Sequence, residues 1–175
     1  MLELLYSKNE IDNAVGRIAY NIYMDFHNKK DLVLIGVLKG SYVFLADLSR
    51  KLAPEHQIDF VSMSSYGENG DEQGDVKFLL DTSLNIKGKN IILVEDIIDS
   101  GNTIEYLMNV FKSKGAKSVS ICSLIAREGL KTKSAIRYRG FTVEKNKFVV
   151  GYGLDYKESY RQLSSIYCVV QENVQ

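Results

Sequence analysis

The chain has 175 residues, of which 45% are hydrophobic and 25% are charged, and its 22 basic residues balance its 22 acidic ones. This length predicts one domain with a real core over residues 1–175, and the zero net charge argues against bulk binding to nucleic acid. No apolar run approaches the ~20 residues of a membrane helix, and the first residues lack the features of a signal peptide. We therefore expect a cytoplasmic protein with no membrane partner, whose two cysteines, Cys122 and Cys168, are reduced and buried.

Alternating strand and helix patterns in the first two thirds of the chain predict an α/β fold with a mainly parallel sheet. Ser7 and Glu10 have the spacing of a capping box, and apolar residues then recur at helical spacing over residues 9–29. An unbroken apolar run predicts a buried strand at residues 32–38, followed by a helix over residues 42–52 that ends before a proline.

A long hairpin is expected next, with strands at residues 58–64 and 76–84. The residues between them, 67–75, are rich in glycine and acids and lack an apolar anchor, which is typical of a mobile loop. The remaining predicted elements are a strand from residue 91, a helix over 102–114 ended by Gly115, a strand at 119–126, a polar irregular stretch at 127–146, and short strands at 148–152 and 166–170.

The most informative segment is residues 91–103, with the sequence IILVEDIIDSGNT. Its apolar strand ends in two adjacent carboxylates, Glu95 and Asp96, which are costly inside a sheet but suit the carboxyl end of a strand, where α/β proteins bind ligands. Asp99 then opens a short turn before a helix, and such a turn presents backbone N–H groups and a helix N-terminus to a phosphate. An ordinary turn with Asp99 or Thr103 as the helix cap is the alternative that this segment alone leaves open.

Three segments of the chain resemble those of one enzyme family. Residues 91–103 are similar to the phosphoribosyl pyrophosphate signature of the type I phosphoribosyltransferases. Residues 38–41, LKGS, and 147–156, KFVVGYGLDY, resemble the loop after the first core strand and the purine-binding segment of the hypoxanthine (hypoxanthine-guanine) phosphoribosyltransferases, the 6-oxopurine branch of that family. Arg161 follows at the family spacing, and the resemblance runs in order over nearly the whole chain.

The resemblance implies the type I phosphoribosyltransferase fold. In that fold a mainly parallel central sheet is flanked by helices, with a small hood from roughly residues 1–10 and 127–175 and a flexible hairpin lid at residues 65–76. It also implies an enzyme of purine salvage that transfers the 5-phosphoribosyl group of phosphoribosyl pyrophosphate to hypoxanthine, and also to guanine. The products are IMP or GMP and pyrophosphate, the cofactor is Mg²⁺, and the family is usually a homodimer or homotetramer.

The same resemblance gives roles to individual residues, with Asp99 as the general base that takes a proton from purine N7. The ribose and 5′-phosphate are expected at Glu95, Asp96, Asp99, Ser100, Gly101, Asn102 and Thr103. The pyrophosphate is expected at Lys39, Gly40, Ser65, Tyr66 and Arg161, and the peptide before this lysine is often cis in the family. The purine is expected at Arg127, Phe148, Val149 and Asp155, and Mg²⁺ at Glu95, Asp96 and Asp155.

Two positions depart from the family pattern. Arg127 stands where a lysine usually donates to the purine 6-oxo group, and a guanidinium can donate there too, but with a different geometry. Asn102 stands in the phosphate loop where a lysine is common. The choice among hypoxanthine, guanine and xanthine is therefore not fixed by these residues.

A non-catalytic regulator of the same fold, which senses phosphoribosyl pyrophosphate and binds nucleic acid, is the alternative function. The neutral charge of the chain disfavours it, as do the intact purine-side residues Phe148, Asp155 and Arg161.

Overall fold

The computed structural model describes residues 1–65, 76–130 and 132–170. Its main sheet has the strand order β4-β3-β2-β5-β6-β7 and is parallel except for β4, which pairs antiparallel with β3. The strands are β2 (Leu32–Leu38), β3 (His56–Ser65), β4 (Val76–Leu80), β5 (Asn90–Ile98), β6 (Ser118–Arg127) and β7 (Ile136–Val143). The expected α/β fold with a mainly parallel sheet is confirmed.

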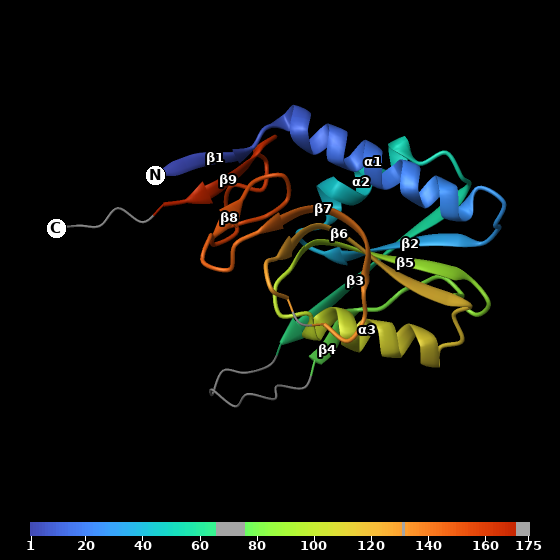
Figure 1. Ribbon diagram of the computed structural model, residues 1–175. Coiled ribbons are helices and arrows are strands. Elements are labelled where there is room, and N and C mark those ends of the chain that lie inside the picture. The colour runs from blue at the N-terminus through green and yellow to red at the C-terminus, as the bar shows by residue number, and fades with distance from the viewer. Residues whose placement is uncertain (66–75, 131, 171–175) are drawn as a thin grey trace.

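Helices cover both faces of this sheet (Figure 1). The helices α1 (Lys8–Phe26) and α2 (Tyr42–Lys51) lie on one face, and α3 (Asn102–Ser113) lies on the other. Each face has its own apolar core. Ile18 and Phe44 belong to the core under α1 and α2, and Leu107 and Phe111 belong to the core under α3. The central strands therefore carry apolar residues on both faces, which explains the unbroken apolar run of β2.

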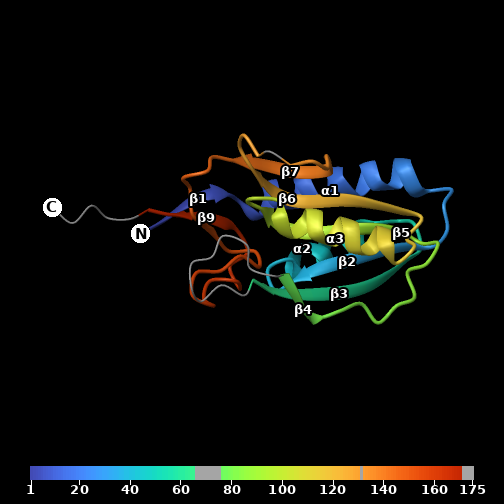
Figure 2. The same cartoon turned by 90° about the horizontal axis from the view of Figure 1, so that it is seen from below.

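The two ends of the chain meet in a second, smaller sheet with the order β1-β9-β8. Its strands are β1 (Leu2–Tyr6), β8 (Val149–Val150) and β9 (Ile166–Val169), all antiparallel. Figures 1 and 2 both place this sheet beyond the carboxyl ends of the parallel strands. A ligand held at those strand ends therefore lies between the two sheets.

The helices follow the sequence expectations closely. The capping box at the start of α1 is present, since the hydroxyl of Ser7 accepts from the backbone N–H of Glu10 at 3.3 Å and the Glu10 carboxylate accepts from the backbone N–H of Ser7 at 2.9 Å. Gly115 follows α3 with a φ of +84°, as a residue that ends a helix often does. Both cysteines are free thiols, but only Cys122 is buried, and Cys168 is half-buried.

Two strands were missed by the sequence patterns. The stretch 127–146, expected to be irregular, contains β7, which extends the main sheet by pairing in parallel with β6. The strand β1 was not expected, and it exists because it pairs with β9 at the other end of the chain. The lid expected at residues 65–76 lies mostly outside the described residues, which include only its two ends.

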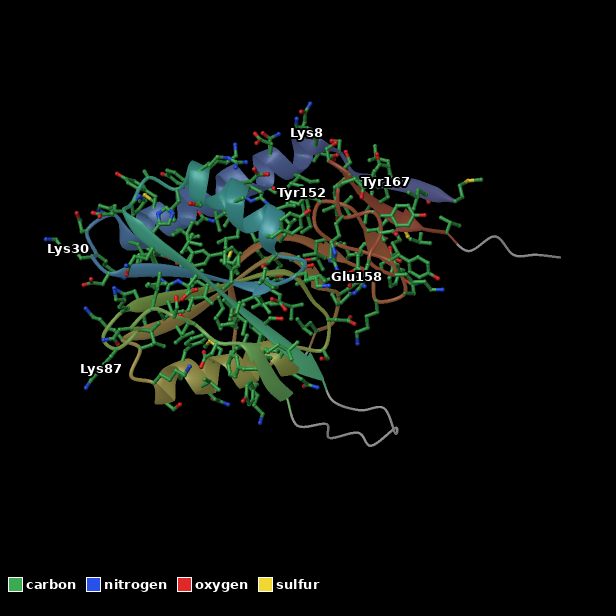
Figure 3. All side chains as sticks on the ribbon, turned by 180° about the vertical axis from the view of Figure 1, so that it is seen from behind. Lys8, Lys30, Lys87, Tyr152, Glu158 and Tyr167 are labelled. Carbon is green, nitrogen blue, oxygen red and sulfur yellow. The ribbon has the colours of Figure 1, made fainter. Side chains whose placement is uncertain are left out.

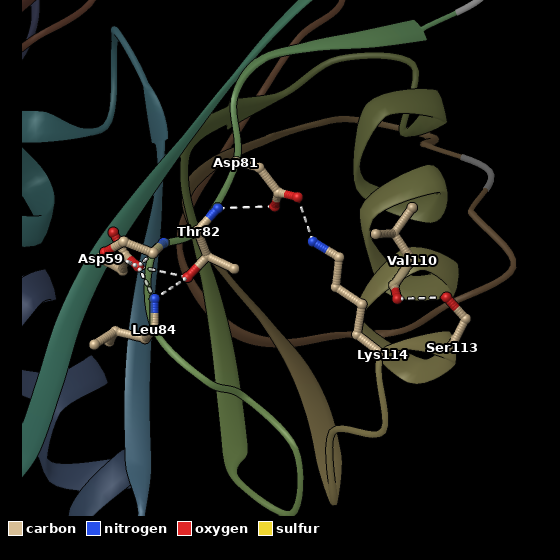
Figure 4. A network of polar contacts seen from close by, with 8 residues as sticks. Asp59, Asp81, Thr82, Leu84, Val110, Ser113 and Lys114 are labelled. Atoms are coloured by element: carbon tan, nitrogen blue, oxygen red, sulfur yellow. Dashed lines mark hydrogen bonds and ion pairs between the residues drawn. The ribbon is translucent and has the colours of Figure 1, made fainter.

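The strand β4 ends earlier than expected because the residues after β4 form hydrogen bonds to Asp59 of β3 (Figure 4). Its Oδ2 accepts hydrogen bonds from the backbone N–H of Ser83 at 2.8 Å and of Leu84 at 3.0 Å. Lys114, just after α3, forms an ion pair with Asp81 at 2.5 Å. These contacts turn the chain out of the sheet and fix the base of the β3–β4 hairpin against α3.

Within the described ranges, no helix has both the length and the apolar character needed to cross a membrane.

Candidate functional site

The site lies where the order of strands in the main sheet reverses. From β2 the chain moves to β3 on one side, and it later returns to form β5 on the other side of β2. At such a point the loops after the two central strands diverge and leave a crevice for a ligand. The two loops are residues 39–41 after β2 and residues 99–101 after β5, and both contain residues singled out in the sequence.

The loop after β5 forms a small concave surface at the start of α3. Gly101 precedes the helix with a φ of +83°, a conformation that favours glycine, and a Cβ there would lie 2.5 Å from the side chain of Thr132. A cavity of about 110 Å³ is lined by Glu95, Ile97, Ile98, Asp99, Ser100, Gly101, Thr103 and Ile104. Free N–H groups in the first turn of a helix favour an anion at this place.

The two adjacent acids of β5 lie on different sides of this crevice, as alternation along a strand requires. Glu95 lines the cavity beside the loop of residues 99–101, while Asp96 lies against Gly40 in the loop after β2. The Oε2 atom of Glu95 is buried and has no hydrogen-bond partner among the described residues. An unpaired buried carboxylate oxygen is costly, and it is a feature expected of a site that binds a cation or a hydroxyl group.

Burial raises the pKa of both acids. The pKa of Glu95 lies well above its usual value because the carboxyl is buried and Asp96 is close. Burial raises the pKa of Asp96 to about 6, with a smaller contribution from Asp155, although backbone N–H groups and Arg161 act in the opposite direction. Two neighbouring acids with raised pKa values at a strand end are typical of a functional site.

Two glycines allow the loop after β2 to fit tightly between its neighbours. A Cβ on Gly40 would lie 1.7 Å from Oδ2 of Asp96, and a Cβ on Gly153, whose φ is +99°, would lie 2.2 Å from the carbonyl oxygen of Gly40. The peptide between Leu38 and Lys39 is cis, as the resemblance of this segment implied. Close approach of backbone therefore brings Lys39 next to the acids of β5 and to the segment after β8.

A chain of ion pairs joins Lys39 to that segment. Nζ of Lys39 lies 3.0 Å from Oε2 of Glu158, whose Oε1 lies 3.2 Å from Nη2 of Arg161. The same nitrogen of Arg161 lies 2.9 Å from Oδ1 of Asp155, and Nη1 of Arg161 donates to the carbonyl of Gly153 at 2.8 Å. Lys39, Arg161 and Asp155, which the sequence singled out, are thus brought together by a residue that it did not single out, Glu158.

A second contact joins Asp99 to Arg127. Nε of Arg127 donates to Oδ1 of Asp99 at 3.1 Å, and its Nη1 donates to the carbonyls of Glu144 at 3.1 Å and Lys147 at 2.6 Å. The side chain of Arg127 is 9% exposed, whereas that of Asp99 is 78% exposed. The carboxylate is therefore open to a ligand on one side and anchored to a fixed guanidinium on the other.

Phe148 directly follows Lys147, whose carbonyl accepts from Arg127, and it precedes the buried Val149. Its aromatic ring is half-exposed. It packs edge-on against Tyr156, with ring centroids 5.5 Å apart and an interplanar angle of 81°. An accessible aromatic face of this kind can stack on a planar heterocycle.

Not every predicted site residue is brought into one group. Asp155 pairs with Arg161, and within the described part of the chain no three acidic, histidine or cysteine residues converge to hold a metal ion. Ser65 ends β3, but its side chain and the whole of Tyr66 lie outside the described residues. Asn102 is the first residue of α3, and its backbone N–H donates to Oγ of Ser100 at 3.4 Å.

The residues that sequence reasoning missed are Glu158, Tyr156, and the carbonyls of Glu144 and Lys147. Glu158 and Tyr156 lie in or next to a segment that had been recognised, so their charge and aromatic character were visible signals. The two carbonyls had none, because backbone acceptors are shared by every residue.

Comparison with known proteins agrees with this geometry. Residues 3–157 match the family model described as "Phosphoribosyl transferase domain". The chain is 40% identical over 167 residues to the hypoxanthine phosphoribosyltransferase of Buchnera aphidicola subsp. Schizaphis graminum, covering 94% of each chain. It is 39% identical over 171 residues to the hypoxanthine-guanine phosphoribosyltransferase of Streptococcus pyogenes, covering 97% of this chain and 94% of that one.

Solved structures give the same result. A crystal structure of a hypoxanthine-guanine phosphoribosyltransferase from Bacillus anthracis, with a HEPES molecule in its active site, is 41% identical and superposes with a TM-score of 0.90. The match covers 96% of this chain and 98% of that one. The strand order, the loops at the switch point and these similarities together show that the chain belongs to the phosphoribosyl transferase domain family.

Proposed function

We propose that this protein transfers the 5-phosphoribosyl group of phosphoribosyl pyrophosphate to hypoxanthine, and also to guanine, with release of pyrophosphate. The observation that carries the proposal is the pairing of Asp99, in the loop before α3, with Arg127, which also binds the carbonyl of Lys147 directly before the half-exposed Phe148. Relatives named for this activity match almost the whole chain, which supports the same assignment. No observation favours the regulator of the same fold, and we do not propose it.

The proposed binding mode follows the shape of the site. The 5′-phosphate is assigned to residues 99–103, where the first turn of α3 offers N–H groups and the hydroxyls of Ser100 and Thr103 add donors. The ribose hydroxyls are assigned to Glu95 and Asp96. The pyrophosphate is assigned to Lys39, Gly40 and Arg161, with Ser65 and Tyr66 as further contacts, since a guanidinium and an ammonium are good phosphate partners.

The purine is assigned to the other side of Asp99. The ring of Phe148 stacks on the base, the backbone of Val149 reads its exocyclic edge, and Arg127 donates to the 6-oxo group. Nε and Nη1 of Arg127 bind Asp99 and the two carbonyls, and Nη2, which makes no hydrogen bond to a described residue, is assigned this role. Asp155 lies on the same segment and completes the proposed pocket.

The residues fit a magnesium-dependent reaction. The buried Oε2 of Glu95 lacks a hydrogen-bond partner within the described ranges, and Asp96, the following residue in the sequence, supplies a second hard oxygen donor. Bound Mg²⁺ would neutralise charge on the departing pyrophosphate, and it usually shares such phosphates and keeps several waters. We therefore propose Glu95 and Asp96, and Asp155 through waters, as the residues that hold it.

In the proposed reaction a purine nitrogen forms a bond to C1 of the ribose while the bond from C1 to the pyrophosphate oxygen breaks. Asp99 accepts the proton that the purine loses from N7. The transition state resembles an oxocarbenium ion, as in other glycosyl transfers, so the carboxylates near the ribose also stabilise its positive charge. Arg127 holds Asp99 in place for this proton transfer.

The proposal has wider parts that rest on the family resemblance. These are a single domain over residues 1–175, a hood from roughly residues 1–10 and 127–175 that covers the base, a hairpin lid at residues 65–76, a homodimer or homotetramer, and a cytoplasmic location. The meeting of β1, β8 and β9 beyond the strand ends supports the hood.

The experiment that tests this function offers the protein a choice of bases. Phosphoribosyl pyrophosphate and Mg²⁺ are incubated with equal amounts of hypoxanthine, guanine, xanthine and adenine, and the nucleotides are identified by mass spectrometry. We expect IMP first, GMP second and no AMP, with one pyrophosphate per nucleotide. Formation of AMP alone, or of no nucleotide at all, would reject the proposal.

A further inference from the structure

Glu158 bridges the two cations to which the proposed function assigns the pyrophosphate. Its Oε2 lies 3.0 Å from Nζ of Lys39, and its Oε1 lies 3.2 Å from Nη2 of Arg161. Both oxygens of one carboxylate are thus used, in the way that two oxygens of a pyrophosphate would be. The hydrogen bond from Lys39 holds the pKa of Glu158 below its usual value, so this carboxylate is an anion at neutral pH.

The backbone around Glu158 presents its side chain to these cations. Its backbone N–H donates to Oδ2 of Asp155 at 2.8 Å, and Tyr156 and Ser159 exchange two backbone hydrogen bonds across the turn. Glu158 itself has a φ of +63°, in the left-handed region that residues other than glycine rarely adopt. Figure 3 shows Glu158 on the loop between the main sheet and the small sheet, with Tyr152 of the same segment nearer to α2.

We propose that Glu158 is an internal competitor of pyrophosphate, which holds Lys39 and Arg161 when the site is empty and must be displaced when phosphoribosyl pyrophosphate binds. This inference rests on the proposed function, because it needs those two cations to be the pyrophosphate contacts. Glu158 would thereby set how tightly the site binds the pyrophosphate group. The same carboxylate returns to the cations as pyrophosphate departs, and this favours product release.

The other contacts of Arg161 make such an exchange feasible. Asp155 at 2.9 Å and the carbonyl of Gly153 at 2.8 Å keep the guanidinium in place after Glu158 has left. Lys39 and Glu158 are 67% and 65% exposed, so their pairing is weakened by solvent and easily broken. The competition is therefore modest, and its removal is expected to tighten pyrophosphate binding by about threefold to tenfold.

The test measures dissociation constants of magnesium pyrophosphate and of phosphoribosyl pyrophosphate by isothermal titration calorimetry. Glu158→Gln keeps the shape of the side chain and removes its charge, and Glu158→Ala is the second variant. Asp81→Asn is the matched control, because it also removes one carboxylate paired with a lysine, but beside α3 and away from the site. Lys39→Met is made alone and together with Glu158→Gln.

We expect Glu158→Gln to bind pyrophosphate about threefold to tenfold more tightly than the parent protein, and Asp81→Asn to bind it unchanged. In the background of Lys39→Met, the gain from Glu158→Gln should be largely lost. Equal or weaker binding by both Glu158 variants would overturn the inference while leaving the proposed function standing. A parent protein that binds neither pyrophosphate nor phosphoribosyl pyrophosphate would instead reject the proposed function.

Discussion

Nε of Arg127 donates to Oδ1 of Asp99 across 3.1 Å, and this contact joins the loop after β5 to the end of β6. The guanidinium is also fixed by two backbone carbonyls, those of Glu144 and Lys147, in the loop before β8. One side chain therefore sets the position of the proposed base and ties it to the segment that carries Phe148. A lysine, with a single nitrogen at its tip, has no fork with which to make the same set of contacts.

Replacement of Arg127 tests this connection. We expect Arg127→Met to lower kcat/KM for hypoxanthine by at least about a hundredfold. Asp99 would lose the hydrogen bond that positions it, and the purine 6-oxo group would lose its proposed donor. Arg127→Lys should keep measurable activity but change the ratio of kcat/KM values for hypoxanthine and guanine. Steady-state kinetics with both bases checks the two variants.

The control for Arg127 is Arg17→Met, which also removes an arginine that donates to a backbone carbonyl, here that of Gly140 at 3.0 Å on the surface. Its kinetics should match those of the parent protein. Full activity in Arg127→Met would show that the contact with Asp99 has no catalytic importance.

Asp99 itself is expected to act on the chemical step. Asp99→Asn should lower kcat by about 10²- to 10⁴-fold, the usual contribution of a general base, because an amide cannot accept the purine proton. Affinity for phosphoribosyl pyrophosphate should change little, since the substitution leaves the backbone of residues 100–103, to which the phosphate is assigned, unchanged. Pre-steady-state turnover and a binding titration separate the two effects, and unchanged turnover would remove Asp99 from the role of base.

The raised pKa of Asp96 predicts how stability depends on pH without ligand. Burial moves this pKa from 3.8 to about 6, so between these values the native state binds more protons than the unfolded state. The free energy of unfolding should therefore fall as the pH rises from about 4 to about 6, and the loss should be complete above pH 6. The raised pKa of Glu95 acts in the same direction.

Asp96→Asn should remove most of this loss in the free energy of unfolding, because an amide carries no charge. We expect the variant to be more stable than the parent by on the order of 2 kcal/mol at pH 7.5, and by much less near pH 4. Urea unfolding at a series of pH values measures the difference, with Mg²⁺ and substrates absent. A variant that is less stable than the parent at pH 7.5 would contradict the burial of an unfavourable charge.

Two glycines form a matched pair for testing how closely the loops pack. A Cβ on Gly40 would lie 1.7 Å from Oδ2 of Asp96, so Gly40→Ala should cost about 1–3 kcal/mol of stability and weaken binding of phosphoribosyl pyrophosphate. A Cβ on Gly16, inside α1, would have no described atom within 4 Å, so Gly16→Ala should stabilise the protein by about 0.5–1 kcal/mol. Thermal unfolding of both variants checks the opposite signs, and a stable Gly40→Ala that binds normally would show that the loop can move away from Asp96.

The elements predicted well are those whose signals are local. The boundaries of β2 coincide with its apolar run, and the Ser7–Glu10 capping box marks the start of α1. The strand β1 instead forms because it pairs with β9 at the opposite end of the sequence, and no residue near position 2 indicates that pairing. The stretch that contains β7 was predicted to be irregular because it is polar, but Arg137 is paired with Asp25 of α1 and the strand forms the edge of the sheet beside β6.

The candidate site divides in the same way. The acids of β5 and the loop before α3 could be found because they interrupt an apolar pattern at a strand end. The charge of Glu158 was visible beside a recognised segment, but its pairing with Lys39 could not be predicted, because it depends on a turn with left-handed backbone and on two loops that meet only in the fold. The anchoring of Arg127 by backbone carbonyls likewise depends on three-dimensional placement alone.

The proposed transfer reaction is best tested by the initial rate of IMP formation from hypoxanthine and phosphoribosyl pyrophosphate, followed spectrophotometrically with and without Mg²⁺. We predict rapid turnover that depends on Mg²⁺ and falls to near background in Asp99→Asn. No turnover of hypoxanthine or of any other 6-oxopurine, by a protein that still binds phosphoribosyl pyrophosphate, would show that the protein is not a 6-oxopurine phosphoribosyltransferase.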